Sequence, residues 1–263
     1  MQPPRDWPPT PRPHGTAWWT VAFVGQVLRA AIWRRRGERG WAPGELRRQL
    51  DHAGPRSVPI ALLTCSLIGL MLAYMAGAQL ARIGAQGFLA DVVTVGMVRE
   101  LAGMMTGIVL AGRVGASYAA QLAAMQAGEE IDALRALGVD PVAHLVLPRL
   151  AALVLVAPPL IALGAVAGVL AGWPAAVLAY GLSSPEYLQQ CLRALTPTHV
   201  WIGLFKGVLY AALVAVATCR AGLLAGRSAE AVGTATTSAV VRSLVWIVAA
   251  ACATTVVFTA LGY

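Results

Sequence analysis

Residues 150–185 contain no charged side chain, and this run limits what the chain can fold into more than any other feature. A bilayer core about 30 Å thick is crossed by about 20 apolar helical residues, because each residue of a helix rises about 1.5 Å. Residues 57–81 form a second uncharged run, and the whole chain is 58% hydrophobic and only 12% charged. One soluble core does not bury that much apolar surface. The sequence therefore predicts an integral membrane protein.

We predict five transmembrane helices and an all-α fold, because unpaired backbone groups are not tolerated in lipid. The expected spans cover residues 57–81, 92–127, 150–173, 200–219 and 243–262, within one membrane domain over residues 57–263. The second span carries Arg99, Glu100 and Arg113, but its other residues are almost all apolar or small. We count it as a span that places charges inside the membrane.

The segment before the first span is expected to have three parts. Residues 1–15 are rich in proline and have the composition of a disordered arm. Residues 16–56 are expected to hold an interfacial helix with tryptophans at its ends, followed by a short amphipathic helix over residues 43–54. A sixth span over residues 17–33 is the alternative, although its apolar part is only 16 residues long.

The arginines predict the orientation of the chain. Eight of them lie between residues 29 and 56, ahead of the first span, and the positive-inside rule keeps that segment in the cytoplasm. With five spans, the basic loops 128–149 and 220–242 fall on the same side, and the C-terminus lies outside. We therefore expect a multi-pass protein of the bacterial inner membrane. Topology accounts for the net charge of +8, and no groove-reading motif indicates nucleic acid.

Between the second and third spans, residues 129–140 hold four of the chain's 12 acidic residues. Glycines on either side are expected to cap a helix of about nine residues, which is too short to cross a membrane. Acidic residues fill its first turn, and Ile131, Leu134 and Leu137 form an apolar stripe beside them. A surface helix packed on its own membrane domain would have this periodicity. So would a helix that docks in a cleft on a soluble partner.

The chain resembles the MlaE/YrbE permeases, the membrane subunits of Mla- and Mce-type lipid ABC transporters, over VRELAGMMTGIVLAGRVGASYAAQLAAMQAGEEIDALRALGVDPVAHLVLPR. The resemblance continues through GLFKGVLYA and AEAVGTATTSAVV, and covers nearly everything from about residue 45 onward. It implies a permease that moves phospholipid or a related lipid between the inner membrane and an extracytoplasmic carrier. The implied partners are a separate ABC ATPase, a second permease copy or homologue, and an MCE-domain protein. The resemblance also allows for a small STAS-type accessory subunit.

In that family the segment matching residues 129–138 is a cytoplasmic coupling helix that receives the ATPase. The coupling residues implied here are Glu129, Glu130, Ile131, Asp132, Leu134, Arg135, Leu137 and Gly138. The chain has no GxxxxGK[ST] loop and no HExxH or GxSxG motif. We therefore expect no enzymatic activity, no metal and no cofactor in this chain, with ATP and Mg²⁺ bound by the partner ATPase.

Charges within the membrane cost about 2.5–3.5 kcal/mol each on insertion scales, so they usually line a functional path or are paired. Those of this chain are Arg99, Glu100, Arg113 and Lys206. They are expected either to edge a lipid pocket, which the resemblance places between the two permease copies, or to tie helices together. At 100° per residue Glu100 shares a face with Gly107 and Tyr118, whereas Arg99 and Arg113 share another. Snorkelling to the interface is the further alternative for Lys206.

Two glycine patterns predict close helix packing in the membrane. Gly103 and Gly107 form a GxxxG pair in the second span. Gly164, Gly168 and Gly172 recur every four residues in the third span, which leaves a smooth ridge on that helix.

Two other function classes compete with the lipid permease. A small-solute ABC importer permease would explain DALRALG followed by LP, but Gly138 and Pro148 are closer together than is usual in the cytoplasmic loop of that class. An ATPase-independent carrier or scaffold is the second, and it predicts no partner for the acidic helix. Co-purification of an ATPase separates this second class from both transporter classes.

Overall fold

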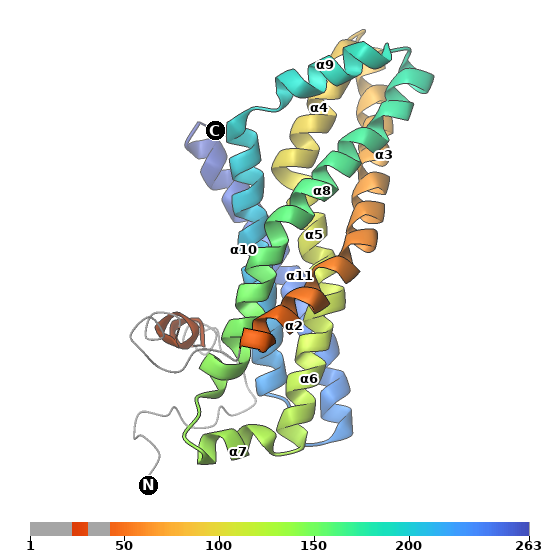
Figure 1. Cartoon of the computed structure of the whole chain (residues 1–263). Coiled ribbons are helices and arrows are strands. Elements are labelled where there is room, and N and C mark those ends of the chain that lie inside the picture. The colour runs from red at the N-terminus through yellow and green to blue at the C-terminus, as the bar shows by residue number, and fades with distance from the viewer. Residues whose placement is uncertain (1–22, 31–42, 263) are drawn as a thin grey trace. The chain divides into compact units, whose positions relative to one another are not determined.

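The structure is a computed structural model of the chain, and it describes residues 23–30 and 43–262 (Figure 1). Nearly all of these residues are helical, and none of them forms a strand. The arm expected over residues 1–15 lies outside the described residues. So does most of the interfacial helix expected ahead of residue 43, of which the structure describes a helical piece over residues 23–30.

Five helical segments are long and apolar enough to cross a membrane, which confirms the prediction of an all-α membrane protein with five spans. They are Gly44–Arg82, Gln86–Ala127, Val142–Tyr180, Pro197–Leu223 and Ala229–Ala260. Most reach beyond their predicted limits, because backbone hydrogen bonding continues where hydropathy falls. The third was expected to end at residue 173 but runs on through Pro174; neighbouring helices make proline tolerable within membrane helices.

The helical elements outside residues 23–30 are named here as in Figure 1. In chain order they are α2 (Pro43–Ala53), η2 (Pro55–Ser57), α3 (Val58–Arg82), η3 (Gln86–Phe88), α4 (Leu89–Gly96), η4 (Met97–Leu101), α5 (Ala102–Leu110), η5 (Ala111–Gly115), α6 (Ala116–Ala127), α7 (Glu130–Ala136), η6 (Val142–Val146), α8 (Leu147–Tyr180), α9 (Ser184–Ala194), α10 (Pro197–Leu223) and α11 (Ala229–Ala260). Three of them, η4, η5 and η6, are π-helical turns within longer helices. Such turns are rare and often mark functional sites.

The chain divides into two compact units. Unit 1 consists of the residues up to Ala53 together with Ala111–Leu155 and Ala212–Val245, and it contains α2, α6 and α7. Unit 2 consists of Gly54–Leu110, Val156–Ala211 and Trp246–Tyr263, and it contains α3, α4, α5 and α9. Each unit is described separately below.

In unit 1, a buried tyrosine holds three helices together. Tyr118 of α6 is fully buried, and the ring of His52 from α2 stacks on it with centroids 6.2 Å apart. The guanidinium of Arg149 from α8 lies 5.5 Å from the centre of the same ring. Arg149 also donates hydrogen bonds to the Leu145 carbonyl (2.7 Å) and to the Gln121 side chain (3.2 Å). A buried cation is thereby partnered by a ring and by neutral oxygens.

In unit 2, the ridge of α8 packs on α3, η4 and α9. A Cβ added at Gly164 would lie 2.8 Å from the sulfur of Cys65 in α3, and one at Gly168 would lie 2.2 Å from Met97 in η4. At Gly172 the neighbour is Tyr187 of α9. The glycines therefore allow three elements to approach one helix closely.

The glycine pair of the second span also lies at helix contacts in unit 2. A Cβ added at Gly103 would meet the backbone of Gly203 and Gly207 in α10 at 3.3 Å. At Gly107 it would meet Tyr210 of α10 and Ile247 of α11. All five glycines predicted to pack helices therefore contact neighbouring elements of the same chain.

Gly69→Ala is expected to destabilise the protein by about 1–3 kcal/mol, the usual cost of overpacking. The new methyl group would lie 2.0 Å from the carbonyl oxygen of Gly168, so the backbones of α3 and α8 would have to separate. Thermal unfolding of the detergent-purified protein measures the loss. Gly233→Ala is the matched control, because a Cβ there meets nothing within 4 Å and alanine favours a helix. Equal unfolding temperatures for the two variants would show that the close contact is not needed.

Candidate functional site

The acidic helix α7 lies in unit 1 and begins later than the sequence predicts. Gly128 was expected to cap it, but the Gly128 N–H donates to the Ala124 carbonyl (2.9 Å) and so ends α6. Glu129 is the residue before the helix, with φ at +59°, a conformation that is uncommon for a residue other than glycine. The helix therefore has seven residues instead of about nine.

The end of α7 is closed by glycine, as its sequence suggests. Gly138 has φ at +75°, and its N–H donates to the Arg135 carbonyl at 3.0 Å. The N–H of Val139 donates to the Leu134 carbonyl at 2.9 Å. This pair of bonds is the Schellman arrangement, which requires a left-handed residue where Gly138 stands.

Two of the three carboxylates at the start of α7 are bound to an arginine outside the helix. Arg227 donates from one nitrogen to Glu129 (3.0 Å) and from another to Asp132 (2.6 Å). Asp132 also accepts a hydrogen bond from Arg135 at 2.8 Å. Glu130 is exposed and has no ion pair within the described part of the chain. Of these three carboxylates, that of Glu130 is therefore available to a group from another molecule.

Arg227 was not among the predicted site residues. It stands two residues before α11, in a loop whose arginines entered the prediction only through their effect on topology. Its partners are 98 and 95 positions away in sequence. The one available signal was the presence of both charge signs in two loops predicted to lie on the same side of the membrane.

The predicted apolar stripe of α7 is not equally exposed along its length. Ile131 is fully buried, whereas Leu137 is 78% exposed and Leu134 is intermediate. Burial of an isoleucine contributes about 1.5–3 kcal/mol, so Ile131 fastens the helix to unit 1. Leu134 and Leu137 remain accessible for contacts with another molecule.

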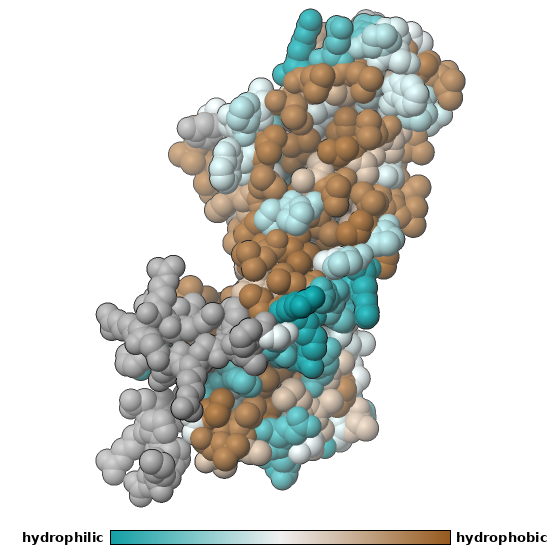
Figure 2. Space-filling view, viewed as in Figure 1, coloured by the Kyte–Doolittle hydropathy of each residue, from teal (hydrophilic) through white to brown (hydrophobic). Residues whose placement is uncertain are grey.

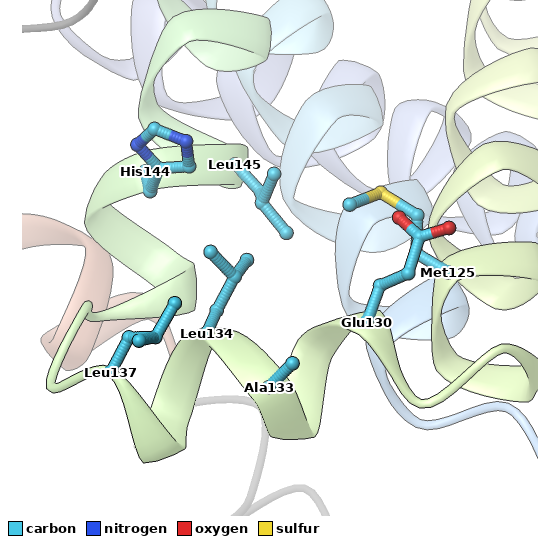
Figure 3. A pocket seen from close by; sticks show the side chains of 7 residues that line it. All are labelled: Met125, Glu130, Ala133, Leu134, Leu137, His144 and Leu145. Carbon is cyan, nitrogen blue, oxygen red and sulfur yellow. The ribbon is translucent and has the colours of Figure 1, made fainter.

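A hollow of about 260 Å³ opens beside α7. It is lined by Met125, Glu130, Ala133, Leu134, Leu137, His144 and Leu145. Figure 3 shows Leu134 pointing into it toward Leu145, with Glu130 and Met125 on one side and His144 on the other. An apolar hollow with a carboxylate at its rim suits an apolar side chain that has a cation beside it.

The intramembrane charges of unit 2 form one hydrogen-bonded group. The ammonium of Lys206 in α10 donates to the carboxylate of Glu100 in η4 and, at 2.9 Å, to the hydroxyl of Thr255 in α11. Thr255 donates to the other oxygen of Glu100 at 3.2 Å, and the Nε of Arg99 lies 3.7 Å from this carboxylate. The group therefore joins three spans.

Exposure within this group is unequal. The Lys206 side chain is 1% exposed, whereas that of Glu100 is 32% exposed. Lys206 therefore does not snorkel to an interface, because its ammonium is held between helices by two oxygen atoms. The carboxylate therefore has an edge that another molecule could reach, whereas the ammonium does not.

Arg113 is assigned to unit 1 and donates to the backbone carbonyl of His52 at 3.1 Å. The predicted shared faces assumed 100° per residue throughout the second span. The two π-helical turns η4 and η5 contradict this assumption, since each adds a residue to its turn and rotates the side chains that follow. The grouping of Arg99 with Arg113 on one face is therefore corrected.

Within the described residues, no group of three or more His, Cys, Asp or Glu side chains could hold a metal ion. Both clusters are held together by ion pairs and hydrogen bonds.

The family model described as Permease MlaE matches residues 46–257. The chain belongs to the MlaE permease family. Its resemblance to the MlaE permeases is thereby confirmed, and the matched range includes α7, its hollow, Arg227 and the Glu100 group.

Curated relatives of this MlaE permease include two probable ABC transporter permease proteins and a chloroplastic plant protein. A probable ABC transporter permease protein of Rickettsia prowazekii is 36% identical over 200 residues, which cover 76% of this chain and 77% of that protein. One of Synechocystis is 33% identical over 196 residues, or 74% of each chain. The chloroplastic protein TRIGALACTOSYLDIACYLGLYCEROL 1 of Arabidopsis thaliana is 34% identical over 199 residues, which cover 76% of this chain and 57% of that protein.

Proposed function

We propose that this MlaE permease is the membrane subunit of an ABC transporter that moves phospholipid or a related lipid between the inner membrane and an extracytoplasmic MCE-type carrier. A separate ATPase would supply the energy. The observation that carries the proposal is α7, an acidic helix outside the spans. One of its carboxylates has no ion pair within residues 23–30 and 43–262, and an apolar hollow lies beside it. The names of the relatives as ABC transporter permeases support the ATPase. The Arabidopsis relative bears the name of a glycolipid, which supports a lipid substrate.

The arginine distribution supports an orientation with α7 in the cytoplasm, where ATP is available, and with the C-terminus outside. The ATPase would place an apolar side chain in the hollow and a neighbouring lysine or arginine against Glu130. Glu129 and Asp132 would not take part in this contact, because Arg227 already holds them.

Arg227 would instead carry movement from α7 into the fifth span. It stands two residues ahead of α11, so a displacement of α7 during the ATPase cycle would pull on the first turn of that helix. The pairs are exposed and contribute little to stability, since exposed pairs are worth about 0.2–1 kcal/mol. Their value would lie in the link between two segments distant in sequence.

Arg227→Glu is expected to lower the lipid moved per ATP by about 2- to 30-fold, the range that corresponds to a coupling change of about 0.5–2 kcal/mol. The ATPase should still bind, because Glu130 and the hollow are unchanged. Lipid transfer and ATP hydrolysis are measured together in proteoliposomes. Exchanging the charges in Arg227→Glu/Glu129→Arg should restore much of the ratio. An undiminished ratio in the single variant would contradict the link.

In unit 2, the Glu100 group would border the lipid pocket, with its exposed carboxylate edge toward the substrate. A second permease copy or a homologue would complete this pocket. An MCE-domain protein would receive or deliver the lipid, and a STAS-type subunit would join the ATPase. The Lys206 ammonium would fix the carboxylate in place.

Purification from native membranes tests the proposal directly. The tagged permease should retain an ABC ATPase and an MCE-domain protein, and mass spectrometry should detect a lipid class enriched over the surrounding membrane. Retention of neither protein, with lipids in bulk proportions, would favour an ATPase-independent carrier or scaffold.

A further inference from the structure

The helix α9 joins the third and fourth spans and was not predicted from hydropathy. Ser183 precedes it, and the Ser183 hydroxyl accepts a hydrogen bond from the Glu186 N–H at 3.3 Å. Serine followed three residues later by glutamate, with Pro185 in the first turn, is a sequence signal for a helix start. The helix is therefore specified locally.

One side of α9 is fastened to unit 2. Tyr187 is fully buried, lies at Gly172 of α8 and donates to the Val169 carbonyl at 2.9 Å. Cys191 is buried one turn later, and α9 packs against α4. In Figure 1, α9 crosses the ends of α4 and α8. Its buried side is thus fully accounted for by the chain itself.

A second side of α9 is apolar but has no partner in the described chain. Leu188 and Leu192, with Leu195 just after the helix, are exposed and lie next to the buried side at 100° per residue. Leu192 is 74% exposed. Glu186 and Arg193 lie on the remaining, polar side. The helix is therefore amphipathic beyond what its packing on unit 2 requires.

The short connections on either side of α9 keep it close to the ends of the third and fourth spans. The third span ends at Tyr180 and the fourth begins at Pro197, so only three residues precede α9 and two follow it. A chain extends at most about 3.6 Å per residue, so both ends of α9 must stay within about 15 Å of the span ends. At that level the spans expose Leu178 and Trp201, and tryptophan is enriched at membrane interfaces. Figure 2 shows polar side chains gathered at the α9 end of unit 2, next to a mostly apolar surface.

We propose that α9 lies in the membrane–water interface, with Leu188, Leu192 and Leu195 against lipid acyl chains. Glu186 and Arg193 then face headgroups and water. An interfacial helix has this combination of an apolar side and a charged side. Lipid fits better than a protein partner for two reasons. The leucine side of α9 continues the apolar surface of the adjoining spans. It also contains no aromatic or arginine side chain of the kind on which protein interfaces centre. The one aromatic side chain of α9, Tyr187, points inward.

Cysteine labelling tests this placement without any ATPase or carrier. Leu192→Cys and its neighbour Arg193→Cys are made in a Cys252→Ser background, because Cys252 is the exposed native cysteine. The other native thiols are buried, and burial raises the pKa of the Cys191 thiol, which keeps it protonated and unreactive. Each variant of the full chain is labelled with an environment-sensitive fluorophore. It is then reconstituted in phosphatidylcholine and phosphatidylglycerol vesicles.

A nitroxide near the top of the acyl chain should quench the probe at residue 192 several-fold more than the probe at residue 193, and aqueous iodide should show the reverse order. Leu188→Cys and Gln189→Cys form a second matched pair, in case one label disturbs the helix. Strong iodide quenching at both members of each pair would overturn the proposal and place α9 in water. Protection of residues 188 and 192 from both quenchers would also overturn it, because a second copy or another protein would then cover the leucines.

Discussion

Leu137→Asp is expected to abolish co-purification of the ATPase while the permease still folds and inserts. Leu137 lines the hollow and is mostly exposed, so its replacement leaves the core of unit 1 intact. A docking partner would have to desolvate the new carboxylate against an apolar surface that already has Glu130 at its rim. Loss of a central interface contact costs about 2–4 kcal/mol, or about 30- to 700-fold in affinity.

Ala136→Asp is the matched control for this variant. Ala136 is exposed on the same helix and does not line the hollow, so the same charge is introduced outside the proposed contact. Leu134→Asp tests the hollow from a second position. Retention of the ATPase is measured by affinity purification, and folding by the elution volume in detergent. Wild-type retention in both leucine variants would remove α7 from the docking site.

Glu100→Gln is expected to cost about 3–5 kcal/mol of stability, the usual range when a buried ion pair loses one partner. Lys206 would lose its anionic partner and keep only the Thr255 hydroxyl and a neutral amide, and its side chain is almost completely buried. Lys206→Met should cost less, because Glu100 is partly exposed and Arg99 lies 3.7 Å from it. Thermal unfolding in detergent measures the loss of stability in each of the two variants.

The double variant Glu100→Gln/Lys206→Met separates a structural role from a lipid-binding role. Removing both charges should recover most of the stability, since a buried pair is often replaced by neutral residues at little net cost. If the group also borders the lipid pocket, the double variant should be stable yet retain less lipid on purification. Wild-type lipid retention in a stable double variant would leave the group as a structural tie only. Wild-type stability of Glu100→Gln would exclude even that tie.

Much of the fold can be predicted from the sequence, because hydropathy and residue spacing act over short stretches of the chain. Long apolar runs predict the five spans, and the regular spacing of Gly164, Gly168 and Gly172 predicts a packing ridge. The span limits were less accurate, because hydropathy does not register a helix that continues into polar sequence. For α9, the Ser183 and Glu186 pair was present as a signal, but hydropathy alone passed over it.

The candidate sites were predicted less completely than the spans. The acidic and apolar residues of α7 follow from composition and periodicity, but their division into paired and free carboxylates does not. Arg227 decides that division from 98 and 95 positions away. The π-helical turns around Glu100 and Arg113 also change which side chains share a face.

The sequence by itself determined that this chain is a membrane protein with five spans, and that a short acidic helix lies between the second and third of them. Hydropathy and helix capping decide these features over a few turns of chain. Only the tertiary structure decided that Lys206 meets Glu100 and Thr255 and that Arg227 binds two carboxylates at the start of α7. It also decided that Glu130, beside the hollow, has no ion pair among the described residues. A charged side chain pairs with an opposite charge that the fold brings within a few ångströms, and no local sequence pattern predicts which residue that is.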